Sequence, residues 1–155
     1  MENKRIVHII ITLAIMLLIF IQSAMTGDLS GAESSFIVKI IVAITGLTAD
    51  NLEIIVRKAA HFTEFMLLGM SLTVNVTDFN DTRPRLKEGW LRILIPWAIG
   101  TLYAATDELH QLLVPGRACS ITDVCIDSAG AALGVAVMTL LIARRSQNKK
   151  AHKAL

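Results

Sequence analysis

Apolar residues are concentrated in four long runs that polar stretches separate. The runs cover residues 6–24, 59–77, 91–114 and 123–143. A helix needs roughly 20 apolar residues to cross a hydrocarbon layer about 30 Å thick. The pattern therefore predicts an all-α integral membrane protein with four transmembrane helices, in which residues 1–155 form a single membrane domain.

A fifth apolar run, 36–47, is too short to cross the bilayer. It lies between the first two long runs and ends near Gly46, a residue type that often terminates helices. We expect a short interfacial or re-entrant helix in the first outer loop. After it, the residues 50–53 resemble a capping box, which would start the second helix several residues before it enters the bilayer.

Lys and Arg residues gather before the first long run, between the second and third runs, and after the fourth. An even number of spans puts these three places on one side, which the positive-inside rule assigns to the cytoplasm. We expect cytoplasmic termini in a multi-pass protein of the cell membrane, with residues 144–155 as a mobile basic tail attracted to anionic lipid. Eleven of the fifteen basic residues belong to these groups: Lys4, Arg5, Arg83, Arg85, Lys87, Arg92, Arg144, Arg145, Lys149, Lys150 and Lys153.

Composition adds little chemistry to this outline. Hydrophobic residues make up 54% of the chain, which agrees with a membrane protein, and the net charge of +2 does not point to nucleic acid. Cys119 and Cys125 lack a metal-ligand spacing, so we expect two free thiols and neither a metal nor a cofactor. The first run is longer than a signal-peptide core of about 7–15 residues, and we expect it to be retained as a helix.

In this topology, the polar ends of all four runs meet at the outer face of the membrane. Helical spacing puts Arg57, His61 and Glu64 on one face of the second helix. Ionisable groups at that depth are costly against lipid, so they should face one another or a wet cavity. Similar faces are predicted on the third helix by Tyr103, Asp107, His110 and Gln111, and on the fourth by Asp123, Asp127, Gly130 and Gly134, whose glycines suggest a close-packing seam.

Three of these stretches resemble the VanZ-like family. They are RKAAHFTEF from Arg57 to Phe65, YAATDELHQLLVPGR from Tyr103 to Arg117, and DVCIDSAGAALG from Asp123 to Gly134. Their order, their spacing and the four-helix outline agree with that family over most of the chain. The resemblance implies a protein that confers low-level resistance to teicoplanin-type glycopeptide antibiotics; it implies no particular biochemical activity.

The polar residues allow three interpretations. They form a structural ionic network between helices; they bind an anionic lipid-linked precursor of the cell envelope; or they catalyse hydrolysis or transfer at a lipid-linked phosphate. His61 and Glu64 do not have the His-Glu-x-x-His spacing of zinc proteases, and no serine nucleophile motif is present.

We favour the binding interpretation, with membrane lipids as partners, and the sequence leaves open whether the protein is an enzyme. The candidate acid–base residues are His61, Glu64, Asp107, Glu108, His110, Asp123 and Asp127, and the candidate ligand-binding residues are Arg57, Lys58, Gln111 and Arg117.

Overall fold

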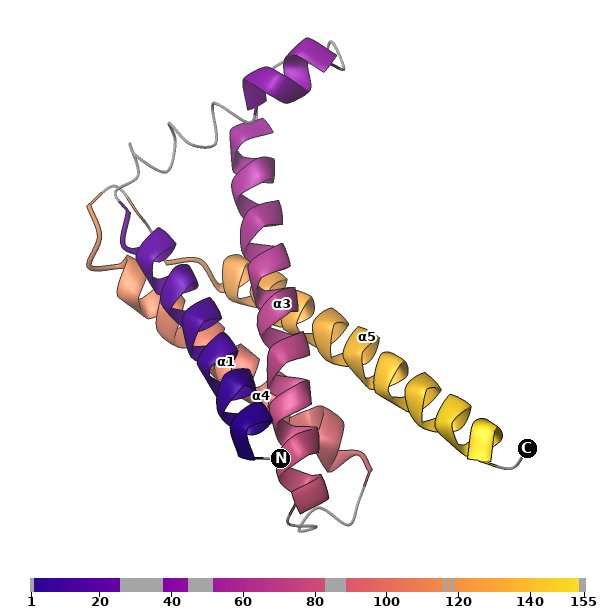
Figure 1. Ribbon diagram of the computed structural model, residues 1–155. Coiled ribbons are helices and arrows are strands. Elements are labelled where there is room, and N and C mark those ends of the chain that lie inside the picture. The colour runs from indigo at the N-terminus through magenta and orange to yellow at the C-terminus, as the bar shows by residue number, and fades with distance from the viewer. Residues whose placement is uncertain are drawn as a thin grey trace.

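The structure is a computed structural model (Figure 1). Helices account for almost all of the residues that it describes. The described residues are 2–25, 38–44, 52–82, 89–115, 117 and 119–153, and they contain no strand. The all-α prediction is therefore confirmed. The long helices are α1 (Glu2–Ser23), α3 (Leu52–Thr82), α4 (Leu91–Gln111) and α5 (Ile121–Lys153), and a short helix covers 38–44.

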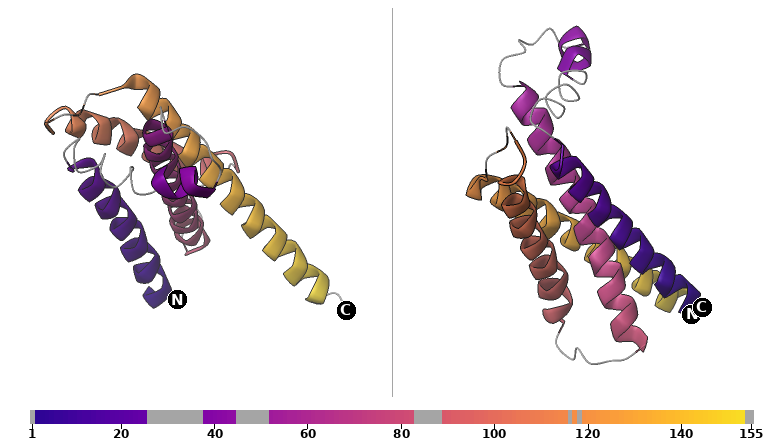
Figure 2. Two further views of the ribbon diagram at one scale, coloured as in Figure 1. Left: turned by 90° about the horizontal axis from the view of Figure 1, so that it is seen from above. Right: turned by 90° about the vertical axis from the view of Figure 1, so that its left-hand side faces the viewer.

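The four long helices alternate in direction along the chain (Figures 1 and 2). We call the end where α1 and α4 finish and α5 begins the site end; the first half of α3 also lies there and projects beyond the other helices. We call the opposite end, where both chain termini lie, the termini end. This arrangement places the predicted polar helix ends together without fixing where a membrane lies.

Three glycines let α3 and α5 cross with their backbones in close contact. A Cβ atom on Gly130 or Gly134 of α5 would overlap the carbonyl oxygens of Phe62 or Met66 on α3. A Cβ on Gly69 of α3 would overlap the backbone of α5 in the same way. The predicted close-packing seam at Gly130 and Gly134 is present, and it has the small-residue spacing that lets membrane helices approach closely.

The outer surface of the helices is strongly apolar. Ile19, Phe65, Leu68 and Ala104 form a buried core, whereas most large apolar side chains of α1 are exposed. Soluble monomers rarely expose contiguous apolar patches of this kind. Two helical segments, Asn3–Ser23 and Ile121–Asn148, are long and apolar enough to cross a membrane.

Two helices end at other residues than the apolar runs suggested. The third predicted helix, 91–114, ends at Gln111, and hydrogen-bonded turns follow it, including Val114 N–H to Gln111 O at 3.0 Å. The basic tail, predicted to be mobile, continues α5 as a helix to Lys153, because Ala, Arg, Lys and Gln favour helices and no Gly or Pro interrupts them. The predicted capping box at 50–53 lies outside the described residues, apart from the backbone of α3 from Leu52 onward.

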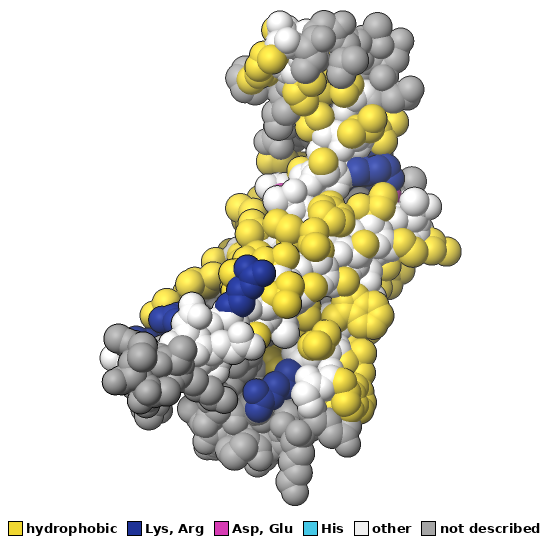
Figure 3. All heavy atoms as spheres, turned by 90° about the vertical axis from the view of Figure 1, so that its right-hand side faces the viewer, with side chains coloured by type: hydrophobic (Ala, Val, Ile, Leu, Met, Phe, Trp, Pro, Cys, Tyr) yellow, Lys and Arg dark blue, Asp and Glu magenta, His cyan; other side chains and the backbone are white. Residues whose placement is uncertain are grey.

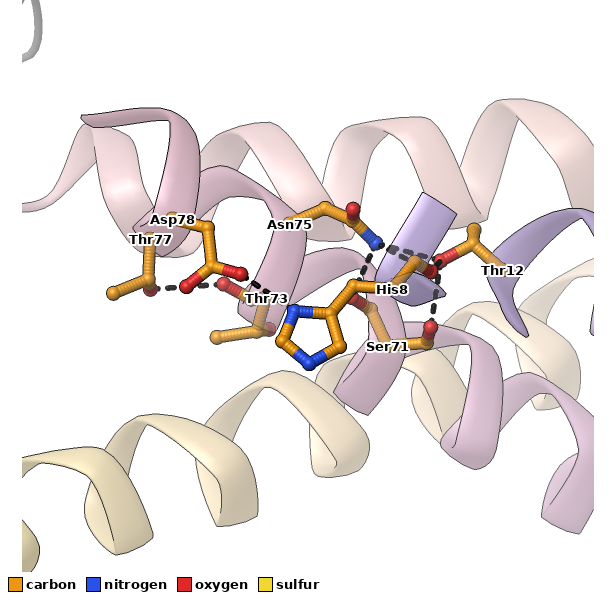
Figure 4. Close-up of polar contacts among 7 residues, drawn as sticks. All are labelled: His8, Thr12, Ser71, Thr73, Asn75, Thr77 and Asp78. Atoms are coloured by element: carbon orange, nitrogen blue, oxygen red, sulfur yellow. Dashed lines mark hydrogen bonds and ion pairs between the residues drawn. The ribbon is translucent and has the colours of Figure 1, made fainter. Parts of the chain in front are cut away.

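Near the termini end, polar side chains join α1 to α3 (Figure 4). Thr12 Oγ1 lies 2.6 Å from Ser71 Oγ, and Asn75 Nδ2 donates to Thr12 Oγ1 at 2.7 Å and to Ser71 O at 3.0 Å. One turn farther toward the terminus, His8 Nδ1 contacts Asp78 Oδ2. His8 therefore has a specific partner on α3.

Candidate functional site

A small polar cavity lies at the site end between α3, α4 and α5. Its volume is about 30 Å³, enough for a few small atoms, since a single water occupies roughly 10–15 Å³ on this measure. Nearly all of its lining residues are ones that the sequence singled out. They are Arg57, Lys58, His61, Glu108, Gln111, Arg117, Asp123 and Asp127, together with Ile126.

Three cationic side chains line the cavity, and they differ in their hydrogen bonds and ion pairs. Lys58 Nζ forms an ion pair with Asp123 Oδ1, joining α3 to the first turn of α5. Arg117 is bound by hydrogen bonds to neighbouring oxygens. Arg57 has neither a hydrogen bond nor an ion pair within the described part of the chain. Among the described residues, Arg57 is therefore the one of these three cations without a direct partner, although the carboxyl groups of Glu108 and Asp127 line the same cavity.

Arg117 connects the loop after α4 to the end of α1. Its Nε donates to Met25 O at 3.1 Å, its Nη2 to Gln22 O at 3.1 Å, and its Nη1 to Gln111 Oε1 at 3.3 Å. The backbone carbonyl groups of Gln22 and Met25 lie where α1 ends, and Gln22 O also accepts a hydrogen bond from the N–H of Met25 at 3.2 Å. Partial burial, and then the positive charge of Arg57, lower the pKa of Arg117. Both guanidinium groups line the same cavity.

Asp107 is the centre of a hydrogen-bonded group beneath the cavity. It is only 3% exposed, and its Oδ2 accepts hydrogen bonds from Ser23 Oγ at 2.6 Å and Gln111 Nε2 at 3.2 Å. Ser23 is the last residue of α1, so this carboxylate ties α1 to α4. The group fixes the position of Gln111, which in turn holds Arg117.

The carboxylate of Glu108 provides a hydrogen-bond acceptor for a backbone N–H group at the beginning of α5. Its Oε2 accepts a hydrogen bond from the N–H of Ser120 at 2.9 Å. The residues 120–123 have the sequence of a capping box, in which Asp123 would accept that hydrogen bond, but the carboxylate of Asp123 pairs with Lys58 instead. Glu108 therefore positions the start of α5 and still lines the cavity.

Several buried polar atoms next to the cavity have no partner among the described residues. They are His61 Nδ1, Glu64 Oε2 and Asp107 Oδ1. The first two lie 3.9 Å apart, on one face of α3 as the i, i+3 spacing predicts. Buried polar atoms in native proteins normally have hydrogen-bond partners, and exceptions are often found at functional sites.

The remaining candidates divide into one that faces the cavity and one that does not. Asp127, 2% exposed, lies on the glycine face of α5 and lines the cavity. His110 stacks on Phe20 with ring centroids 4.6 Å apart, and it is not among the lining residues. The described residues contain no group of three or more His, Cys, Asp or Glu side chains arranged to hold a metal ion.

The sequence placed the polar end of α1 at the same face as the site, but no residue of α1 was among the candidate site residues. Ser23 and the carbonyl groups of Gln22 and Met25 complete the site. The available signal was the Gln22-Ser23 pair at the end of an otherwise apolar helix. Carbonyl groups carry no side-chain signature, so their role could not be inferred from residue types.

An all-helical fold with an apolar outer surface, two helices able to cross a bilayer and a buried charged cluster define a membrane protein with an internal polar site. A family model described as VanZ/LLP1 matches residues 8–142, so the chain belongs to the VanZ/LLP1 family. The match covers all four long helices and supports the resemblance seen in the sequence. No curated protein and no solved structure gives a significant match.

Proposed function

We propose that α1, α3, α4 and α5 all cross the membrane, with both termini in the cytoplasm and the site end in the outer leaflet. The alternating helix directions support this topology (Figure 1). So do Arg5, Arg92 and Arg145, because Lys and Arg are enriched on the cytoplasmic side. The cations Arg57, Lys58 and Arg117 depart from that trend, which suggests that the neighbouring acids or an anionic ligand hold them there.

We infer that the polar cavity binds the anionic group of a lipid-linked cell-envelope component, and that this binding lowers susceptibility to teicoplanin-type glycopeptides. The observation that carries the proposal is Arg57, which lines the cavity without a partner in the described chain. An unpaired cation near the bilayer is unfavourable, and a guanidinium group suits bidentate contact with phosphate. The neighbouring Arg117 would supply a second positive charge.

The dimensions of the cavity limit what enters it. A volume of about 30 Å³ admits the oxygens of a phosphate group but no sugar ring. The rest of such a ligand would lie at the open side of the cavity, with its hydrocarbon chain along the exposed apolar helix surfaces. Recognition would therefore depend on the anionic group, and the pocket would tolerate variation elsewhere in the lipid.

A second candidate function is hydrolysis or group transfer at a lipid-linked phosphate. The unpaired atoms of His61, Glu64 and Asp107 favour it, because a histidine and a carboxylate in one buried place can exchange a proton with a reacting group. In this account the two arginines would stabilise the negative charge that develops on the phosphate.

Binding of a polyprenyl phosphate tests the proposal. The full-length protein in detergent micelles would be compared with Arg57→Gln by native mass spectrometry, with Arg144→Gln as a control that also removes an exposed arginine. Because hydrogen bonds to charged groups contribute about 1.5–3 kcal/mol, we expect roughly tenfold weaker binding for Arg57→Gln and none of this loss for Arg144→Gln. Equal affinity for all three proteins would contradict the proposal.

The same samples separate binding from catalysis. Wild-type protein that retains the lipid and releases no inorganic phosphate behaves as a receptor. Time-dependent phosphate release that Glu64→Gln abolishes would establish the hydrolytic candidate instead. A purely structural network predicts neither binding nor release, together with poor accumulation of the Glu64→Gln protein in cells.

A further inference from the structure

A second and larger cavity lies at the termini end, far along the helices from the polar cavity. Its volume is about 690 Å³, within the range of 300–1,000 Å³ that is usual for small-molecule sites. Its lining residues come from α1, α3, α4 and α5, and α5 diverges from α3 toward the C-terminus (Figure 1). Its lining includes Arg92 at the start of α4, Arg145 on α5 and the pair His8–Asp78.

The charge in this cavity is unbalanced. Arg92 and Arg145 come from different helices, and neither forms an ion pair within the residues that the structure describes. The carboxylate of Asp78, on the same lining, is in contact with His8. Figure 3 shows dark-blue Lys and Arg side chains on opposite sides of a shallow hollow on the face turned to the viewer. The site therefore offers two guanidinium groups to an anion between α4 and α5.

The rest of the lining is partly apolar, with Thr77 and Ser146 adding hydroxyl groups. Met138 and Ile142 of α5 form part of the cavity, and large apolar side chains such as Leu141 are exposed on the adjoining surface. A free inorganic anion gains nothing from such a wall, whereas the glycerol and first acyl carbons of a phospholipid bury apolar area against it. The two arginines would contact the phosphate group of a phospholipid, and the apolar residues would contact its glycerol and first acyl carbons.

We propose that this cavity binds an anionic phospholipid, with its phosphate group held between Arg92 and Arg145. Arginine is well suited to this role because its planar fork can make two parallel hydrogen bonds to phosphate oxygens. The bound lipid would fill the space between the diverging ends of α3 and α5. This site is separate from the polar cavity and does not depend on the function proposed for it.

The test uses the full-length protein reconstituted in vesicles of phosphatidylglycerol and phosphatidylcholine, then extracted in mild detergent. Native mass spectrometry would count the phosphatidylglycerol that remains bound. We expect wild type to retain it, and the double variant Arg92→Gln/Arg145→Gln to bind it at least tenfold more weakly. Arg144→Gln removes a neighbouring exposed arginine and serves as the matched control.

Two outcomes would overturn the proposal. Loss of lipid from Arg144→Gln as large as that from the double variant would mean that only general surface charge attracts it. Displacement of the lipid by millimolar inorganic phosphate would assign the cavity to the free anion.

Three controls accompany the test. Arg92→Lys/Arg145→Lys keeps both charges and should recover part of the binding. Unchanged melting temperatures of all variants would exclude misfolding as the cause of any loss. Arg57→Gln should leave this binding unaffected.

Discussion

Both ends of the helix bundle carry buried polar groups, but the two sets are satisfied differently. Between α1 and α3 near the termini end, Asn75 donates to Thr12 and Ser71 with distances of 2.7 and 3.0 Å. The neutral amide oxygen of Asn75 has no partner in the described chain. At the site end, by contrast, the ionisable residues His61 and Glu64 each keep a buried atom without a partner there. The first set resembles an interhelical contact, and the second resembles a site built for something outside the protein.

This difference suggests that one end of the bundle contributes mainly to stability and the other mainly to ligand binding. Neutral side chains between α1 and α3 join helices at modest cost, as hydroxyl and amide groups commonly do in membrane proteins. Ionised residues are far more costly at the same depth, and their presence is usually connected with function. Stability should therefore depend on the α1–α3 contact and the helix crossing, whereas ligand binding should depend on the charged residues of the site end.

The largest expected effect comes from the α3–α5 crossing, on which both ends depend. Replacing Gly134 by Ala puts a Cβ into the carbonyl oxygen of Met66, so the helices must separate. We expect a loss of about 3 kcal/mol in stability, measured by thermal or denaturant unfolding in detergent. Gly89→Ala is the control, because a Cβ there meets nothing within 4 Å. Equal stability of the two variants would show that the helices do not meet at this seam.

A charge-removing change at the site end should separate function from stability. Asp107→Asn keeps an oxygen for Ser23 and Gln111, so the fold should change by no more than about 1 kcal/mol. Removing the negative charge alters the field around Arg57 and Arg117, and we expect loss of the proposed teicoplanin resistance at normal protein levels. Measurements of teicoplanin susceptibility and of protein accumulation check this together. Collapse of accumulation would instead favour a structural role.

The smallest expected effect lies at the α1–α3 contact. Asn75→Ala removes hydrogen bonds to Thr12 and to the carbonyl groups of His8 and Ser71. Interhelical hydrogen bonds in membrane proteins contribute about 0.6–2 kcal/mol, so we expect about 1 kcal/mol of destabilisation with polyprenyl phosphate binding unchanged. A strong loss of polyprenyl phosphate binding would contradict the proposal that the α1–α3 contact contributes to stability and the site end to ligand binding.

Helical periodicity and residue type predicted much of this arrangement. The apolar runs located the long helices, and i, i+4 spacing placed Arg57, His61 and Asp127 correctly on faces that converge. The close seam followed from the spacing of Gly130 and Gly134 alone.

Features that depend on tertiary contacts could not be predicted from the sequence. The carbonyl groups at the end of α1 that hold Arg117 have no residue signature. The pairing of His8 with Asp78 joins positions seventy residues apart, which local periodicity cannot reveal. The helical continuation of α5 to Lys153 was missed because positive charge was interpreted as a sign of mobility, although the residues involved favour a helix.

The central claim is that the charged residues of α3, α4 and α5 meet on the outer side of the membrane. Single cysteines at Ile55 and Leu113, exposed by 58% and 81%, would mark the site end, and one at Gly89 would mark the opposite end. The background would carry Cys119→Ser and Cys125→Ser, because both native thiols are free and exposed. The account predicts that an impermeant maleimide labels positions 55 and 113 in intact cells and position 89 only after lysis. Labelling of positions 55 and 113 from opposite sides of the membrane would contradict it.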